Sequence, residues 1–170
     1  TVKFFVPEES FSSELESSMD KAIRKQGDEL IRFSEIYMHH AITQSIMHQL
    51  NALSNTTHQY ITSVMAFTNA VISPEEVDPQ EGLNVYTPVH VLVYRRGDCT
   101  DYAVLHASLA AAKDIEYSII IPKPPIDELL RATNDGYSFT TITHMMVGVN
   151  LPPMIRGYRF SNGHLLIDQG

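Results

Sequence analysis

The spacing of apolar residues changes once along this 170-residue chain, near Asp114. Before that point, apolar residues recur at three-, four- or seven-residue steps, as they do along one face of an amphipathic helix. After it they alternate or form short runs, which is typical of strands. A chain that places its helices first and its antiparallel strands last is expected to form an α+β domain.

Three stretches before Asp114 have the helical pattern. Residues 13–49 predict mostly helix, with a break at Gly27 and Asp28 that divides them into two helices. Residues 56–72 predict a third helix. Residues 99–113 predict the strongest helix of the chain because alanine and leucine are good helix formers. The small side chains of this last helix favour close packing against a sheet.

The part of the chain after Asp114 holds strand candidates and one insertion. The strand candidates are residues 117–121, 137–149, 155–160 and 164–168. Residues 122–136 contain prolines and charges and predict an insertion with a short helix at 127–132. The turn Ser161-Asn162-Gly163 predicts a hairpin between the last two strands.

Two other segments have weaker patterns. The apolar run from Val2 to Val6, which Pro7 ends, predicts either an edge strand or a tether. Residues 73–97 contain several prolines and glycines and predict a loop-rich connector around the short run at 89–94.

Composition limits the partners and the domain count. The net charge of −8 argues against nucleic acid and anionic lipid, since both require clustered positive charge. No apolar stretch approaches the roughly 20 residues of a membrane span. A single cysteine allows neither an intrachain disulfide nor a multi-cysteine zinc site.

The length and the hydrophobic content of 44% predict one compact domain. Residues 1–55 are expected to form a helical extension packed on a core of residues 56–170. Because the chain begins at Thr1, we interpret it as a domain excised from a longer protein, whose other domains are expected partners. The sequence does not predict the cellular compartment, and an extracytoplasmic or membrane-associated parent protein is one alternative.

Cys99 stands where a loop is expected to become a helix. Asp98 is a suitable N-cap and would place Cys99 in the first helical turn. The unpaired N–H groups and partial positive charge of a helix N-terminus favour a thiolate, which is the nucleophilic form. The alternative is an inert buried thiol. Gly97 and the acidic neighbours Asp98 and Asp101 favour the reactive interpretation.

A nucleophilic thiol needs a base, and the chain offers eight histidines. His144 opens the alternating run at 145–149 and is therefore expected at a strand edge. His90 and His164 are the alternatives. His106 lies two helical turns beyond Cys99 and is expected to be too far from the sulfur for contact.

Asp168 closes the last predicted strand after three apolar residues. Such a position suits a carboxylate that orients an imidazole, although an exposed strand-end carboxylate is the alternative interpretation. The chain order Cys99, His144, Asp168 fits a triad with a thiol nucleophile.

Residues 97–103, Gly-Asp-Cys-Thr-Asp-Tyr-Ala, follow a proline-led stretch and open a helix of small residues. This motif resembles the nucleophile motif of the transglutaminase-like superfamily. The segments that contain His144 and Asp168 are similar to the family's His and Asp motifs, and the resemblance covers about residues 60–170. The chain departs from the family in having no Trp and in having Lys113-Asp114-Ile115 at the turn after the helix.

The resemblance implies a transglutaminase-like, papain-like cysteine proteinase fold, in which the nucleophile helix packs on a C-terminal antiparallel sheet. It implies the catalytic residues Cys99, His144 and Asp168. It also implies an oxyanion donor at Asn69, where many relatives carry Gln.

The activity expected is thiol-dependent acyl transfer by a cysteine peptidase or amidase on a protein or peptide substrate. Transglutamination, with an amine as acceptor, and a non-catalytic binding module are the alternatives. No cofactor or metal is expected. Calcium serves some relatives, but here only Glu75, Glu76 and Asp78 suggest ligands, and they form no clear ligand loop.

Overall fold

The computed structural model describes residues 1–7, 19–20, 27–74, 84–120, 145–150, 158–161 and 164–167. Its elements, in chain order, are β1 (Met19–Asp20), α2 (Gly27–Met38), α3 (Ala41–Ala52), α4 (Thr57–Val71), β2 (Ser73–Pro74), β3 (Asn84–Val85), α5 (Pro88–Tyr94), β4 (Arg96–Gly97), α6 (Cys99–Ala112), β5 (Tyr117–Ile120), β6 (Met146–Val149), β7 (Tyr158–Ser161) and β8 (His164–Ile167). Helices combine here with two-stranded sheets, so the predicted α+β class is confirmed.

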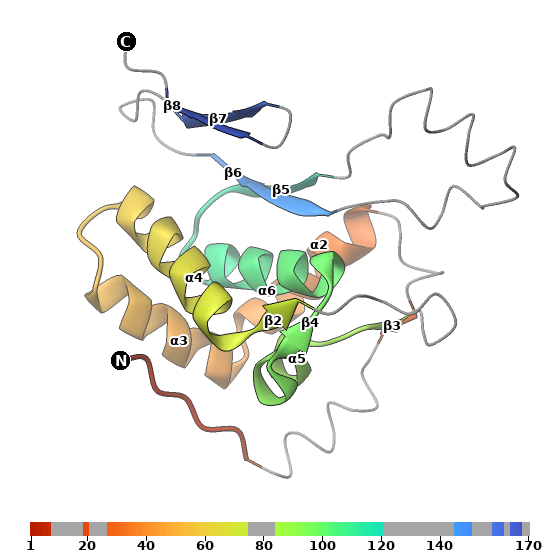
Figure 1. Ribbon diagram of the computed structural model, residues 1–170. Coiled ribbons are helices and arrows are strands. Elements are labelled where there is room, and N and C mark those ends of the chain that lie inside the picture. Colours follow the sequence, from red (N-terminus) through yellow and green to blue (C-terminus); the bar gives the residue numbers. More distant parts are fainter. Residues whose placement is uncertain are drawn as a thin grey trace, which may run out of the picture.

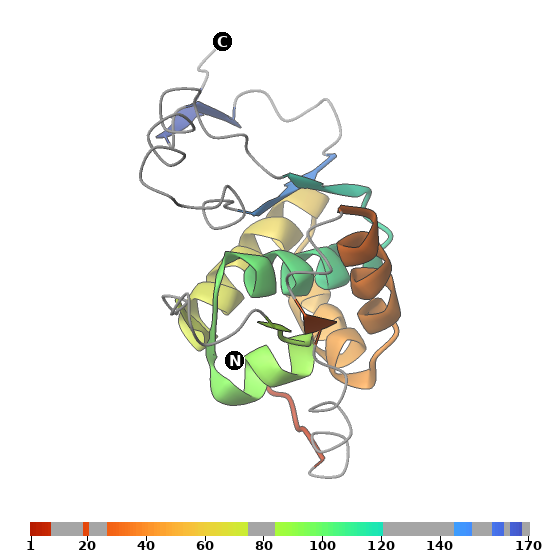
Figure 2. The same cartoon turned by 90° about the vertical axis from the view of Figure 1, so that its right-hand side faces the viewer.

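Helix α6 is the centre of the fold (Figure 1). It contacts α2, α3, α4 and α5, and it also contacts β5 and β6. Its buried residues include Val104, Leu105 and Leu109, and its alanines let neighbouring elements approach on several sides. Figure 2 shows the β5–β6 pair covering one side of α6, with helices around the rest of it. The contact of this helix with antiparallel strands agrees with the sequence prediction.

The predicted helix at residues 56–72 is confirmed as α4, whose N-cap Thr56 accepts a hydrogen bond from the Gln59 N–H. The core joins α4 to the end of α6. The buried Tyr60 hydroxyl donates to the Leu109 carbonyl oxygen at 2.8 Å. Burial raises the pKa of Tyr60, so its hydroxyl remains a donor at neutral pH.

The prediction for residues 13–49 is partly wrong. Helix α2 begins at Gly27, where the break was expected, and α3 begins after a second break at His39 and His40. The His40 side chain accepts a hydrogen bond from the Ile42 N–H and caps α3. Met19 and Asp20 form strand β1 instead of helix, because their backbone pairs antiparallel with β3. Pairing with a distant segment therefore overrides the local helical pattern there.

Helix α5 lies within residues 73–97, which were predicted to be a loop-rich connector around a short run at 89–94. Thr87 is its N-cap and Pro88 its first residue, and both residue types favour a helix start. Arg95 ends the helix in the left-handed conformation, with φ of 56°.

The N-terminal segment 1–7 contains no strand, so the edge-strand alternative is wrong. The Lys3 backbone N–H donates to the Gln49 Oε1 atom at 2.7 Å, and the Gln49 amide donates to the Lys3 carbonyl at 2.5 Å. Phe4 packs edge-on against Phe67, with ring centroids 6.2 Å apart. The segment is thereby held on α3 and α4.

Strands β5, β6, β7 and β8 each overlap a predicted strand, but Ser161, which was predicted in the turn, belongs to β7, and Met145 lies just before β6. Strand β5 pairs antiparallel with β6, and β7 pairs antiparallel with β8, with Ser161 opposite His164 as a short hairpin requires. The predicted insertion at 122–136 and its short helix lie outside the described residues. In the described part of the chain, no helix is long and apolar enough to cross a membrane.

Candidate active site

The N-terminus of α6 is closed by a reciprocal cap that fixes the position of Cys99. The Asp98 side chain accepts hydrogen bonds from the N–H groups of Thr100 and Asp101, at 2.9 and 3.2 Å. The Asp101 side chain accepts in return from the Asp98 N–H at 2.9 Å. This is a capping box, and it makes Cys99 the first residue of the helix. The predicted N-cap role of Asp98 is confirmed.

Asp101 also ties α6 to the chain before α5. Its carboxylate is buried and accepts a second backbone hydrogen bond, from the Tyr86 N–H at 2.8 Å. Gly97 makes room for this arrangement. A Cβ atom at position 97 would lie 3.0 Å from the Asp101 Cβ and 3.3 Å from its Oδ2 atom. A side chain at this position would therefore press on the carboxylate that closes the cap.

The backbone just before Cys99 is held by the end of α4. Strand β4 pairs in parallel with β2, and the Ser73 N–H donates to the Arg95 carbonyl at 2.8 Å. The Tyr102 hydroxyl donates to the Ile72 carbonyl at 2.7 Å. Burial raises the pKa of Tyr102, which keeps this donor protonated. The approach to Cys99 is thus fixed by α4 as well as by α6.

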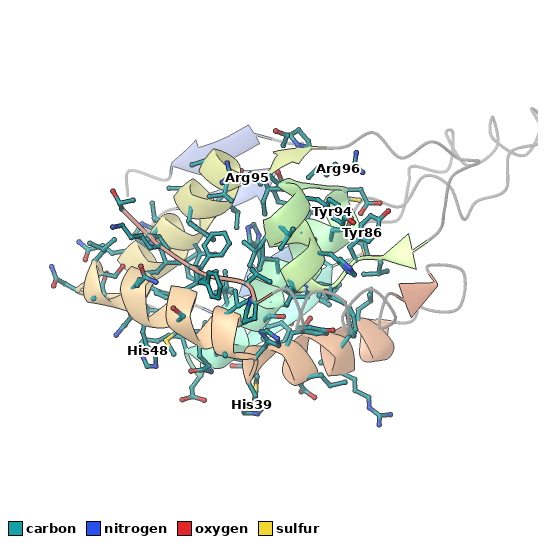
Figure 3. All side chains as sticks on the ribbon, turned by 90° about the horizontal axis from the view of Figure 1, so that it is seen from below. His39, His48, Tyr86, Tyr94, Arg95 and Arg96 are labelled. Atoms are coloured by element: carbon teal, nitrogen blue, oxygen red, sulfur yellow. The ribbon has the colours of Figure 1, made fainter. Side chains whose placement is uncertain are left out.

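Aromatic contacts support α5 on the other side of this turn. The buried His90 ring stacks on Tyr94, with centroids 5.9 Å apart, and its Nδ1 atom is 3.3 Å from the Thr87 hydroxyl. The Arg96 guanidinium lies over the Tyr94 ring, 5.6 Å from its centroid. Both side chains are labelled in Figure 3. His90 is not among the residues that line the cavity beside Cys99, so the structure does not support it as the base.

A cavity of about 550 Å³ lies beside Cys99. One wall is a single face of α6, formed by Cys99, Tyr102, Ala103 and His106 at the spacing of neighbours on a helix. The other walls include residues 145–148, Ile120 of β5 and Met65 of α4. Cys99 therefore borders a space that can hold a small ligand or a substrate side chain.

His144 and Asp168 lie outside the described residues. The residue that follows His144 in the chain is Met145, which is buried and lines the cavity. The residue that precedes Asp168 is Ile167, the last residue of β8. Strand β6 therefore begins in the wall of the cavity that Cys99 also lines. The alternative base His164 lies in β8.

Asn69 is exposed on α4 and is not among the residues that line the cavity. The α4 residue that does line it is Met65, one turn earlier. The structure therefore brings no amide of Asn69 into the cavity wall.

His106 is the site residue that the sequence reasoning set aside. Its distance from Cys99 along the helix is about 10 Å, but the two residues share one face and line the same cavity. Burial lowers the pKa of His106 to about 4, so the ring is neutral at neutral pH. The seven-residue spacing from Cys99 was the signal that could have identified it.

Comparisons of the chain with protein-family models, with curated proteins and with solved structures gave no match. The site must therefore be interpreted from its own chemistry. The described residues contain no group of three His, Cys, Asp or Glu side chains that could hold a metal ion. Glu75, Glu76 and Asp78 lie outside the described residues.

Proposed function

We propose that this protein is a thiol-dependent acyl-transfer enzyme, a cysteine peptidase or amidase with Cys99 as its nucleophile. The observation that carries the proposal is the position of Cys99. It is the first residue of a capped helix and lies in the wall of a cavity of about 550 Å³, within the size range of ligand sites. A helix N-terminus favours the thiolate that such a reaction requires.

In the proposed reaction, the Cys99 sulfur attacks the carbonyl carbon of a protein or peptide amide. The C–N bond breaks, and the leaving amine takes the proton that His144 received from the thiol. Water then attacks the thioester, gives a proton to His144, and releases the carboxylic acid while the thiol regains its proton. Asp168 is proposed to accept the imidazole N–H and to hold the ring in one tautomer.

We propose the backbone N–H of Cys99 as a donor to the oxyanion. An N–H group in the first turn of a helix lies at the positive end of the helix dipole, where it stabilises a developing negative charge. The exposed position of Asn69 gives no support to the second donor that the family resemblance implies.

The finer fold proposed is transglutaminase-like, related to papain-like cysteine proteinases. Two observations support it. The helix that starts at Cys99 packs against the antiparallel pair β5–β6, and β6 begins directly after Met145, the neighbour of His144. Residues 56–170 are the proposed catalytic core in this scheme.

Alkylation of Cys99 with iodoacetamide at pH 6 tests the proposal. An ordinary thiol of pKa about 8.5 is almost wholly protonated there, so an activated cysteine is expected to react at least about tenfold faster than free cysteine. Because the chain has one cysteine, total thiol loss reports on Cys99 alone. The same chain unfolded in urea is the matched control and should react at the rate of free cysteine.

The variant His144→Ala should lower the alkylation rate of the folded protein toward that of the unfolded control. If folded wild-type protein reacts no faster than free cysteine, Cys99 is not an activated nucleophile and the enzyme proposal fails. The fold would then serve some non-catalytic role.

A further inference from the structure

The cavity beside Cys99 has a strongly apolar wall. Three large side chains that line it are substantially exposed: Met65 at 47%, Ile120 at 44% and Met146 at 43%. They come from α4, β5 and β6, so three separate elements turn apolar surface toward one space. An apolar group that covered them would gain the free energy of removing this surface from water.

The polar groups of the same wall are occupied by neighbouring residues. The Asp98 carboxylate at the Cys99 end accepts the N–H groups of α6. His106, farther along α6, lies with its Nε2 atom 2.8 Å from the Thr68 hydroxyl. No Lys or Arg lines the cavity among the described residues.

The contacts of Thr68 indicate which group donates in its hydrogen bond with His106. The Thr68 hydroxyl oxygen is 3.1 Å from the carbonyl oxygens of Val64 and Met65, and a carbonyl can only accept. The single hydroxyl hydrogen is therefore directed to them, and the His106 Nε2–H donates to Thr68. An Nε2–H group donates in both the neutral and the charged ring, and it is the lowered pKa of His106 that makes the imidazole neutral at neutral pH. It offers no charge to pair with a carboxylate or an ammonium group.

We propose that this cavity binds the side chain on the acyl side of the scissile bond and selects an uncharged, apolar side chain, such as that of methionine or leucine. The inference rests on the proposed acyl transfer at Cys99, since the sulfur marks where the acyl carbon is held. His106 lies about 10 Å along the helix axis from Cys99, and its side chain leans back toward the helix N-terminus.

The methionines in the wall determine the kind of selectivity expected. Their unbranched side chains adapt to irregular shapes, so the cavity should discriminate by polarity more than by shape. A glutamate side chain would lose its hydration without gaining a partner of opposite charge. A lysine side chain would meet only the Asp98 carboxylate, which already accepts two N–H groups of α6. Methionine and leucine side chains should therefore bind about equally well, and both should bind better than glutamate or lysine.

Peptide binding to the Cys99→Ala variant tests this without any reaction. The probes are blocked peptides, acetyl-Ala-Ala-Xaa-Ala-amide, with Met, Leu, Ala, Glu or Lys at Xaa. The readout is the NMR shift of the Met65 and Met146 methyl groups and of the His106 ring. The Met and Leu peptides are expected to bind at least about tenfold more tightly than the Ala peptide, which corresponds to the burial of two or three methylene groups. The charged peptides should bind no better than Ala.

Gly148→Ala, made in the Cys99→Ala background, is the pocket variant. A Cβ atom at position 148 would lie 2.8 Å from the Ile120 Cδ1 atom and displace it into a new position in the wall. Binding of the Met peptide should weaken severalfold while binding of the Ala peptide stays unchanged. Met65→Ser is the second variant, in case Gly148→Ala does not fold. Ile36→Ala removes an exposed apolar side chain from α2, away from the cavity, and should change nothing.

Equal binding of all the peptides, preference for a charged one, or no shift at Met65 and Met146 would overturn the pocket assignment. The absence of a shift at Met65 and Met146 is also the result expected if another part of the chain covers the cavity. The outcomes are separate from those of the proposed function. If Cys99 is alkylated fast but the peptides show no apolar selectivity, only the pocket assignment is refuted. If the peptides show apolar selectivity but Cys99 reacts slowly, only the proposed enzyme activity is refuted.

Discussion

Replacing Asp101 with alanine is expected to lower the free energy of unfolding by about 3 kcal/mol and to fray the first turn of α6. The buried carboxylate accepts the N–H groups of Tyr86 and Asp98, and each hydrogen bond to a charged group contributes about 1.5–3 kcal/mol. Alanine would leave both donors without this acceptor. Urea unfolding followed by circular dichroism measures the loss.

Two substitutions serve as controls for this result. Asp98→Ala removes the N-cap side chain and should cost only about 1 kcal/mol. Asp101→Asn keeps one carbonyl oxygen but turns an NH₂ group toward the second donor, so its cost should lie between the other two. If Asp101→Ala costs no more than Asp98→Ala, the buried carboxylate is not the link that fixes Cys99.

Acidification is expected to destabilise the fold through His106. Its pKa is about 4 in the folded protein, against an ordinary value of 6.5, because burial disfavours the charged ring. Between these pH values the unfolded chain binds more protons than the folded one, so stability falls as pH falls from 6.5 to 4 and this contribution levels off below 4. The difference between the folded and the ordinary pKa of His106 corresponds to at most about 3 kcal/mol of the free energy of unfolding. Contact of the ring with water in the cavity lowers this contribution.

The matched variant is His106→Gln, whose amide can still donate to Thr68 but does not titrate. Free energies of unfolding at pH 7, 5.5 and 4 should show a smaller decrease for the variant than for the wild-type protein. An NMR titration of the His106 ring gives the same quantity directly. A folded-state midpoint near 6.5, or equal acid sensitivity in both proteins, would contradict the account.

The elements predicted well are those whose signals are local. The Asp98 cap and the alanine-rich residues that follow define α6 without reference to the rest of the chain. The two-residue strand β1 was missed because it exists only through its pairing with β3. Helix α5 did have local start signals in Thr87 and Pro88, but the β-branched residues after them obscured the helical pattern.

At the site, the sequence placed Cys99 correctly in the first turn of α6, but it did not predict which other side chains line the cavity. His106 was set aside on its distance along the helix, although its spacing from Cys99 put both on one face. Asn69 was named as an oxyanion donor from the family resemblance, and its side chain is exposed outside the described cavity wall. One residue along a helix rotates the side chain by about 100°, and the neighbouring Thr68 is the one buried against His106.

Acylation of Cys99 is the most direct test of the proposed nucleophile. The protein is mixed with p-nitrophenyl acetate at pH 7, quenched in acid and digested, and the peptides are analysed by mass spectrometry. An acetyl group is expected on the peptide that contains Cys99, less of it in His144→Ala, and none at that position in Cys99→Ala. If the folded wild-type protein gains no acetyl group on Cys99, or only on residues away from the cavity, then Cys99 is not the nucleophile of an acyl-transfer enzyme.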